Sequence, residues 1–473
     1  MGDPKAKKLV LVHPPLRNVL GAATPDYVDE NRGHTPPMGL LYLKGAVNRS
    51  RHESRFLDAD LAGLSHEAAA REALSGAPDL VGIQAMTFTM PDACLLAREV
   101  KRFSPETPVM IGGPHPTIYP EETAALPYVD YAFAGEGEEG LVAFLDRMDD
   151  PEARAAVPGV ARRRDGRVSY TPTAGLLADL DRLAFPARRD APYTRYTSVL
   201  AERNPVTIMI TSRGCPFSCV FCNRMGRKYR AHGADYVLAE LDDILSLGVG
   251  EIFIHDDTFS LKRDRVEAIC RGMIERGSPL VWEARTRVDC VDRELLALMR
   301  KAGCTRLSFG VESGSEKVLA AMRKGIQPGR VVDVFSWCRA EGITTLADFM
   351  VGNLEETGED IEKTFALLKR LDPDFAQFSI LSPYPGTPIY QMALDRGVVP
   401  GDVWQEFAKD PLAPFESPVW TEHFSREELD KITARAYRRF YFRPRFILRQ
   451  LRKIHSPATL ATMARGALGM LRG

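Results

Sequence analysis

The stretch RGCPFSCVFCN, residues 213–223, contains three of the 8 cysteines in this 473-residue chain. Their spacing, Cys215-x3-Cys219-x2-Cys222, allows one short loop to turn all three sulfurs toward a single centre. Thiolates are soft ligands that suit zinc and iron–sulfur clusters. The stretch therefore predicts a metal ion or a cluster. A four-iron cluster held by three cysteines would leave one iron open for a substrate or cofactor.

Two alternatives to a cluster stay open from the residues alone. Structural zinc usually takes further ligands from a second Cys/His pair, which is missing here, although a distant histidine could complete such a site. Buried cysteines acting as small apolar residues are a weaker alternative, because three cysteines on one loop with Gly and Pro are poor core patterning. The remaining cysteines are scattered singly, at Cys94, Cys270, Cys290, Cys304 and Cys338.

The bulk composition limits the classes of protein that fit. Hydrophobic residues make up 45% of the chain and charged residues 26%, and the length allows roughly two to four domains. A formal net charge of −1 gives no overall attraction to nucleic acid or membrane. No apolar run approaches the roughly 18–20 residues that span a bilayer, and the early run LVLV is too short for a secretory signal. We expect a cytoplasmic protein with reduced thiols.

The residues around the cysteines predict a parallel α/β structure. PVTIMITSRG, residues 205–214, reads as a buried strand, and ADYVLAELDDILSLG, residues 234–248, has apolar residues at helical spacing. The cysteines thus lie on a loop between a strand and a helix. Strands alternating with helices continue along the chain, giving six repeats in all. The later strands are expected in residues 250–259, 280–289, 304–314, 343–353 and 375–387.

The cysteine spacing, with the aromatic Phe221 before the third cysteine, resembles the signature of the radical S-adenosylmethionine (SAM) superfamily. The resemblance implies a [4Fe–4S] cluster on Cys215, Cys219 and Cys222, with SAM chelating the open iron through its amino and carboxylate groups. The six repeats resemble the superfamily's partial (βα)6 barrel. The chemistry of parallel barrels gathers at the carboxyl ends of the strands.

Charged residues at those strand ends are the candidates for SAM binding that the resemblance implies. Asp256 and Asp257 resemble the element that receives the amino group of SAM, and Glu312 in FGVESG resembles the motif near its ribose. Arg285 and Arg323 are candidates for the SAM carboxylate, because a guanidinium pairs well with a carboxylate. The alternative for each is a solvated loop end or a salt bridge. We assign none of these residues a catalytic role.

Residues 1 to about 145 predict a second α/β unit, a doubly wound, Rossmann-like sheet. A dinucleotide-binding dehydrogenase would carry Gly-x-Gly-x-x-Gly after the first strand, but that strand runs into Pro14-Pro15. The loops at the strand ends resemble those of the cobalamin (B12)-binding domain that many radical SAM enzymes carry. The motif Asp-x-His-x-x-Gly, whose histidine ligates cobalt in some cobalamin proteins, is missing, so no residue is assigned as a ligand to cobalt. The loop residues are Thr87, Thr89, Gly112, Gly113, Pro114, His115, Pro116, Thr117, Gly135, Glu136, Gly137 and Glu138.

These patterns divide the chain into four predicted segments. Residues 1–147 are the cobalamin-binding domain, 148–203 a linker with a hairpin turn at Asp165-Gly166, 204–400 the radical SAM barrel, and 401–473 a helical, basic extension. From Lys431 onward the chain has no Asp or Glu. This segment fits either a helical cap on the barrel or contact with an anionic membrane surface.

The function that the resemblance implies is a cobalamin-dependent radical SAM methyltransferase acting on carbon. Reductive cleavage of SAM gives a 5′-deoxyadenosyl radical that takes hydrogen from an unactivated carbon, to which methylcobalamin passes its methyl group. A hydrophobic or lipid-like small molecule is the expected substrate, with a flavodoxin- or ferredoxin-type electron donor and no nucleic acid partner. Two alternatives remain: an oxidative cyclase or rearrangement enzyme, and a non-catalytic zinc protein that docks on membranes.

Overall fold

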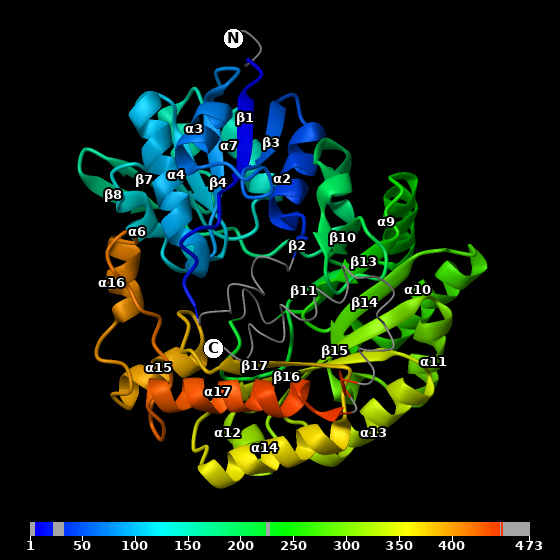
Figure 1. Cartoon of the computed structure of the whole chain (residues 1–473). Coiled ribbons are helices and arrows are strands. Elements are labelled where there is room, and N and C mark those ends of the chain that lie inside the picture. The colour runs from blue at the N-terminus through cyan, green and yellow to red at the C-terminus, as the bar shows by residue number, and fades with distance from the viewer. Residues whose placement is uncertain (1–4, 22–32, 224–227, 445, 448–473) are drawn as a thin grey trace. The chain divides into compact units, whose positions relative to one another are not determined.

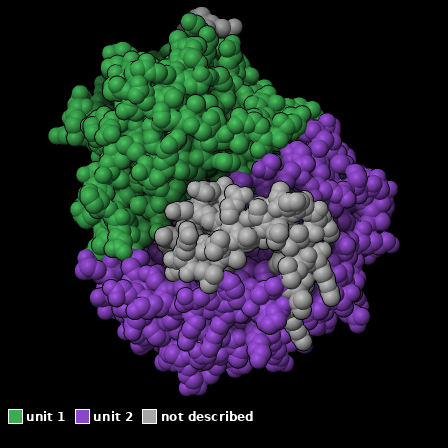
Figure 2. Space-filling view, viewed as in Figure 1, with its two compact units in different colours: residues 1–21, 34–196, 401–417 green, residues 22–33, 197–400, 418–473 purple. Residues whose placement is uncertain are grey.

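The computed structural model describes residues 5–21, 33–223, 228–444 and 446–447. Contacts divide the chain into two compact units, which are coloured separately in Figure 2. Unit 1 comprises residues 1–21, 34–196 and 401–417, and unit 2 comprises residues 22–33, 197–400 and 418–473. In the described part of the chain, no helix is long and apolar enough to cross a membrane.

Unit 1 is built on a seven-stranded sheet with the order β3-β1-β4-β5-β6-β7-β8. The first five strands in this order are parallel to one another. The apolar run of β1 is buried on both faces, as expected for a central parallel strand covered by helices. The strands are β1 (Lys8–His13), β3 (Glu53–Asp58), β4 (Leu80–Gln84), β5 (Val109–Gly112), β6 (Tyr131–Phe133), β7 (Val160–Arg164) and β8 (Arg167–Tyr170).

The helices of unit 1 connect these strands. Leu40 of α2 and Leu141 of α7 share one apolar core with Leu9 and Leu11 of β1, so these two helices cover one face of the sheet. The helices are α2 (Met38–Asn48), α3 (His66–Leu74), α4 (Met90–Phe103), α5 (Pro114–Ile118), α6 (Pro120–Ala125), α7 (Glu138–Asp146), α8 (Pro151–Ala155) and α16 (Val403–Lys409).

The predicted hairpin is present between β7 and β8. Asp165 and Gly166 form its turn, with φ values of 51° and 75°, a pair of left-handed residues typical of two-residue hairpins. Because β7 pairs with β6, the hairpin extends the sheet of unit 1. Residues 160–170 of the segment predicted as a linker, residues 148–203, are therefore part of the sheet, and residues 148–196 belong to unit 1. Residues 401–417, predicted within the C-terminal extension, also belong to unit 1.

Unit 2 contains the six predicted βα repeats as a single parallel sheet with the order β10-β13-β14-β15-β16-β17. Figure 1 shows its helices along the outer face of the curved sheet. The strands are β10 (Val206–Met209), β13 (Glu251–Ile254), β14 (Val281–Thr286), β15 (Cys304–Glu312), β16 (Thr344–Val351) and β17 (Phe375–Ile380). The helices are α9 (Ala234–Ser246), α10 (Arg263–Glu275), α11 (Arg293–Lys301), α12 (Glu316–Ala321), α13 (Pro328–Ala340), α14 (Gly358–Leu371), α15 (Pro388–Asp395) and α17 (Arg426–Tyr441).

Alternating burial along the strands separates the two faces of this sheet. In β16, Ala347, Phe349 and Val351 are fully buried, whereas the intervening Asp348 and Met350 are only partly buried. Side chains at every second position of a strand share a face. The fully buried set faces the helices, and the partly buried set, which includes Asp348, faces the inner side of the barrel.

Helix α17 covers the edge strand β17. The backbone amide of Phe378 donates to the Tyr437 hydroxyl at 3.2 Å, and the Tyr441 hydroxyl donates to the carbonyl of Ala376 at 2.9 Å. Unpaired strand edges invite association with other chains, and these phenols occupy part of this one. Arg435 and Arg439 of α17 form ion pairs with Glu362 of α14.

These contacts match the helical cap that was one of the two predictions for the basic extension. They involve residues 426–443, which lie against α14 and β17. The rest of the basic segment, residues 448–473, lies outside the described residues, so contact with a membrane stays a prediction.

Candidate active site

The cysteine loop is held in place by segments from distant parts of unit 2. The amide of Val220 donates to the carbonyl of Met322 at 3.0 Å, and the carbonyl of Val220 accepts from the amide of Ile389 at 2.9 Å. The side chain of Asn223 donates to the carbonyl of Pro385 at 3.2 Å. The loop PYPGT, residues 383–387, and the start of α15 thus fix the backbone on both sides of the third cysteine, at Val220 and Asn223.

The three cysteines lie together in this loop. Cys219 is buried, Cys215 is half-buried and Cys222 is exposed, and the Cys215 sulfur lies 3.8 Å from the hydroxyl of Thr258. Desolvation, together with Cys219, Asp257 and Cys215, raises the pKa of Cys222 to about 11. Within the described ranges, no three Cys, His, Asp or Glu residues converge on one metal ion. A four-iron cluster does not require this, because each thiolate binds a different iron.

Two cations next to the cysteines add to the fit with an anionic cluster. Arg287 approaches the sulfur of Cys219, and Lys324 lies 5.8 Å from the ring centroid of Phe221, the aromatic residue before the third cysteine. A cluster ligated by thiolates is stabilised by such neighbours. The chemistry of the donor set therefore fits a [4Fe–4S] cluster.

Asp256 binds the segment that leads from β10 into the cysteine loop. Its carboxylate accepts from the amides of Thr211 and Ser212 at 2.6 and 3.0 Å, and from their hydroxyls at 2.5 and 2.6 Å. The residue is only 1% exposed, and burial raises the pKa of its carboxyl. Since both oxygens are occupied, Asp256 fixes the connection from β10 to the cysteine loop.

Asp257 and Arg285 are the more accessible pair of charges. Both are exposed. Asp257 follows β13, and Arg285 lies near the end of the neighbouring strand β14. Desolvation raises the pKa of Asp257, while the Gly214 amide and Arg285 oppose that rise. No hydrogen bond or ion pair joins the Arg285 side chain to another described residue. The pair therefore offers one anionic and one cationic group at the carboxyl end of the sheet.

Glu312 ends β15 in a left-handed conformation, with φ of 64°, at an irregularity in its pairing with β16. Its carboxylate forms a buried ion pair with Lys324, 2.6 Å apart. A Cβ atom on Gly310 would lie 2.4 Å from the Glu312 oxygen and 2.6 Å from the Lys324 nitrogen. Glycine at this position is thus what makes room for the ion pair.

Lys324 of the MRKG motif is buried beside Glu312, and the role predicted for the adjacent Arg323 at SAM stays a prediction. Arg323 is exposed and has a left-handed φ of 53°. The sequence motif indicates that a cation lies near the site. It does not indicate which of the two adjacent basic residues is buried, because that depends on the backbone conformation.

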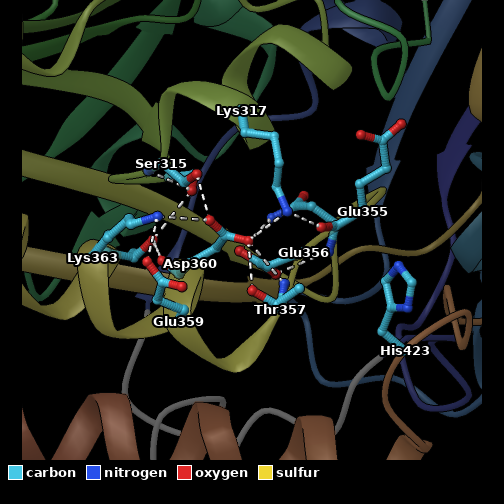
Figure 3. Close-up of polar contacts among 12 residues, drawn as sticks. Ser315, Lys317, Glu355, Glu356, Thr357, Glu359, Asp360, Lys363 and His423 are labelled. Carbon is cyan, nitrogen blue, oxygen red and sulfur yellow. Dashed lines mark hydrogen bonds and ion pairs between the residues drawn. The ribbon is translucent and has the colours of Figure 1, made fainter.

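The loop that follows Glu312 is fixed by the hydrogen-bond network in Figure 3. Asp360 accepts from Ser315 at 2.7 Å, from Lys317 at 2.8 Å and from the Thr357 hydroxyl at 2.8 Å. Burial alone would raise the pKa of Asp360, but these donors hold it well below its usual range. The ionised carboxylate joins the start of α12 to the start of α14.

Asp348 was not predicted, although it lies on the inner face of the barrel. No hydrogen bond or ion pair connects its carboxylate to any residue that the structure describes. Burial and the Glu312 carboxylate raise the pKa of Asp348 to about 7, against the opposite effects of Arg285 and Lys324. Its sequence signal is a single acid within the apolar run TTLADFMV.

The predicted cobalamin loops gather at the carboxyl ends of the strands in unit 1. The Thr117 hydroxyl donates to the carbonyl of Gly113 at 2.8 Å and accepts from the amide of Gly135 at 2.9 Å, which joins the loops after β5 and β6. Gly113 has φ of 124°, and a Cβ atom there would lie 2.6 Å from the Ala85 carbonyl oxygen. Close internal packing thus requires this glycine.

The other residues of these loops are tied to their neighbours in unit 1. The Glu136 carboxylate accepts from the Leu177 amide, and the Thr89 hydroxyl accepts from the Met86 amide. The remaining predicted positions, Gly112, Pro114 and Gly137, lie on the same loops, at the end of β5, at the start of α5 and before α7.

Three buried polar atoms at this edge lack a hydrogen bond of good geometry among the described residues: His13 Nδ1, Gln84 Oε1 and His115 Nε2, although Gln84 lies close enough to His13 to oppose the lowering of its pKa by burial. They belong to the ends of the adjacent strands β1 and β4 and to the loop after β5. Buried polar atoms are normally paired, so the side chains of His13 and Gln84 at this edge fit a ligand with polar groups, such as a corrin with its amide side chains.

His115 itself is inaccessible as a cobalt ligand. It is fully buried, its Nδ1 lies 3.4 Å from the Thr87 hydroxyl, and its ring packs edge-on against Phe407 of α16. Burial lowers the pKa of His115 to about 3, so the imidazole is neutral.

Comparison with known proteins identifies the family. Residues 209–368 match the model of the radical SAM superfamily, and residues 26–145 match that of the B12 binding domain. An uncharacterized methyltransferase of Pyrococcus horikoshii is 31% identical over 458 residues, which is 95% of this chain and 96% of that relative. The chain belongs to the cobalamin-dependent radical SAM methyltransferase family.

The names of two further relatives describe a cyclisation and a methylation. The anaerobic magnesium-protoporphyrin IX monomethyl ester cyclase of Rubrivivax gelatinosus is 28% identical and covers 88% of this chain and 76% of its own. The hopanoid C-3 methylase of Methylococcus capsulatus is 26% identical, with 74% and 67% covered.

A solved structure shares the fold of this family member. The radical SAM methyltransferase TsrM of Kitasatospora setae, solved with cobalamin and a [4Fe–4S] cluster, superposes with a TM-score of 0.68 at 18% identity, covering 84% of this chain and 79% of that one. The predicted fold class is thus confirmed. The cofactors of the enzyme are a [4Fe–4S] cluster, SAM and cobalamin, as the two family matches imply.

Proposed function

We propose that this enzyme methylates an unactivated carbon of a hydrophobic, lipid-like small molecule. The observation that carries the proposal is the meeting of the cysteine loop with Asp257, Arg285 and the Glu312–Lys324 pair at one end of a single six-stranded sheet. When bound, the cofactors supply reductive cleavage of SAM and a carrier for the methyl group, which no side chain can provide.

The chain's own residues would hold and orient these cofactors. Cys215, Cys219 and Cys222 would ligate the cluster. Asp257 and Arg285 would pair with the amino and carboxylate groups of SAM, because an exposed anion and an exposed cation lie next to each other there.

The buried Glu312–Lys324 pair would lie near the SAM ribose, with Phe221 beside it. Asp256, also expected at SAM, supports the cysteine loop in this proposal, and the exposed Arg323 is assigned no contact with SAM. In unit 1 the loops that include Thr87, Thr117 and Gly135 would receive the cobalamin.

The lipid-like substrate class is supported by the hopanoid methylase among the relatives. The inner face of β16 is amphipathic, with Leu346 and Met350 on either side of Asp348. A mainly apolar molecule with one polar group would match this face. An external low-potential donor of the flavodoxin or ferredoxin type would supply the electrons.

Oxidative cyclisation is the second candidate function, because the cyclase relative covers most of this chain. The two reactions differ in their products from SAM. A methyltransferase of this kind forms both 5′-deoxyadenosine and S-adenosylhomocysteine, whereas a cyclase forms only the former. The zinc-protein alternative finds no support in either family match.

The test uses the full chain purified without oxygen and supplied with cobalamin. We expect about four irons and one cobalt per chain. Incubation with a lipid extract, reductant and SAM bearing a deuterated methyl group should give labelled lipid together with both SAM products. A Cys219→Ala variant is the control, and it should give none of these products. Labelled product from that variant, or 5′-deoxyadenosine without S-adenosylhomocysteine from the wild type, would overturn the methylation proposal.

A further inference from the structure

Arg287 is the best-connected buried cation next to the cysteine loop. Its side chain is 6% exposed, and it follows directly after β14. Its Nη1 donates to the sulfur of Cys219 at 3.8 Å, and its Nη2 donates to the carbonyl of Lys324 at 2.8 Å. The Asp289 carboxylate accepts from Nε and Nη2 at 2.9 and 2.7 Å.

An aromatic ring from the cysteine loop completes this environment. The guanidinium carbon lies 3.7 Å from the ring centroid of Phe217, which stands between Cys215 and Cys219 in the sequence. A guanidinium has five N–H groups in one plane, and the contacts of Arg287 use four of them. The side chain is therefore fixed in orientation, and Nη1 is directed at a sulfur.

Arg285 shows the contrast with a ligand-binding arginine. It lies two residues earlier, is exposed, and has no hydrogen bond or ion pair within the described residues. Arg287 is buried and has one N–H group left, so it cannot offer the SAM carboxylate the paired contact that an exposed guanidinium can give. Its contacts point to the cluster instead.

We propose that Arg287 is a positioning residue that sets the reduction potential of the cluster through its hydrogen bond to the Cys219 sulfur. This inference rests on the proposed binding of the cluster by the three cysteines. Reduction adds one electron from a flavodoxin- or ferredoxin-type donor, and Arg287 stays protonated in both states because its pKa is far above neutral. A cationic donor stabilises the added negative charge, which makes the potential less negative.

Asp289 limits this effect. Its carboxylate partly neutralises the guanidinium, so the cluster experiences less positive charge than an isolated arginine would give. The two residues therefore make opposite predictions. Loss of Arg287 should make the potential more negative, and loss of the charge on Asp289 should make it less negative.

The experiment is a redox titration of the reconstituted full-length protein, followed by electron paramagnetic resonance and compared among four variants. Arg287→Gln should shift the midpoint to more negative values, Arg287→Lys should shift it less, and Asp289→Asn should shift it the other way. The matched control is Arg330→Gln. Arg330 donates to the carbonyls of Val288 and Val291 in the same segment, and these bonds involve no cysteine. Its variant should keep the wild-type midpoint.

Measured iron and sulfide content distinguishes failure of the inference about Arg287 from failure of the proposed cluster itself. An unchanged midpoint in an Arg287→Gln protein that holds the wild-type amount of iron would overturn the inference, as would an equal shift in the Arg330→Gln control. If Arg287→Gln loses its iron, Asp289→Asn decides, because it keeps all ligands and the arginine. An unchanged midpoint there would overturn the inference. Wild-type protein without iron would refute the proposed cluster itself.

Discussion

Glu312 and Lys324 form an ion pair whose side chains are only 9% and 8% exposed. Removing one partner of a buried pair leaves an uncompensated charge, which costs about 3–5 kcal/mol. We expect Lys324→Met to lower the free energy of unfolding by this amount, measured by urea denaturation. The adjacent, exposed Arg323→Met is the matched control and should stay within about 0.5 kcal/mol. Equal effects in the two variants would contradict the assignment of Lys324 to the buried pair.

The raised pKa of Asp348, another single residue, predicts that the free energy of unfolding depends on pH. Its pKa in the folded protein is raised to about 7, so the folded state binds a proton that the unfolded state has already lost above about pH 4. Its contribution to stability therefore falls as the pH rises toward and through 7. Between pH 6 and 8, wild type should lose about 1 kcal/mol more than Asp348→Asn in the free energy of unfolding. Parallel profiles of the two proteins would show that Asp348 titrates normally.

At the scale of elements, the contact of α17 with β17 has a measurable consequence. Tyr437→Phe and Tyr441→Phe each remove hydrogen bonds to the backbone of the edge strand, which should cost about 1 kcal/mol per bond. The double variant should also self-associate with increasing concentration, detected by light scattering, because the edge is less protected. Exposed Arg438→Ala on the same helix is the control. Equal light scattering from the control and the double variant would argue against edge protection.

Elements were the part of the structure best predicted from sequence. Strict alternation of strands with helices predicted six parallel repeats, and Asp165-Gly166 predicted a hairpin, both of which are present. The directions of individual side chains were harder to predict from the sequence. Arg287 and Lys324 were missed because their positions depend on how the chain turns after β14 and α12, which no periodicity records. The return of α16 to unit 1 depends on packing such as that of Phe407 on His115.

At the scale of the whole molecule, the two sheets allow the cofactor sites to be tested separately. Each unit has its own strands and core, and the cysteines of the loop belong to unit 2 alone. We expect Cys222→Ala to lose its iron while it retains cobalt at the wild-type level, measured by elemental analysis of the purified protein. Thr117→Val, which removes the hydroxyl that joins two loops of unit 1, should lower cobalt and leave iron unchanged. Joint loss of both metals in either variant would contradict independent sites.

The anchors of the cysteine loop also set an order of events during synthesis. Asn223 contacts Pro385, which is 162 residues further along the chain, and Val220 is bonded to Ile389. At the usual speed of translation, roughly 10–30 seconds separate the appearance of these partners at the ribosome. The nascent cysteines therefore emerge long before the backbone that holds them. We therefore expect the cluster to be inserted into the anchored loop only after residue 389 has been made, and the newly made thiols to need protection from oxygen until then.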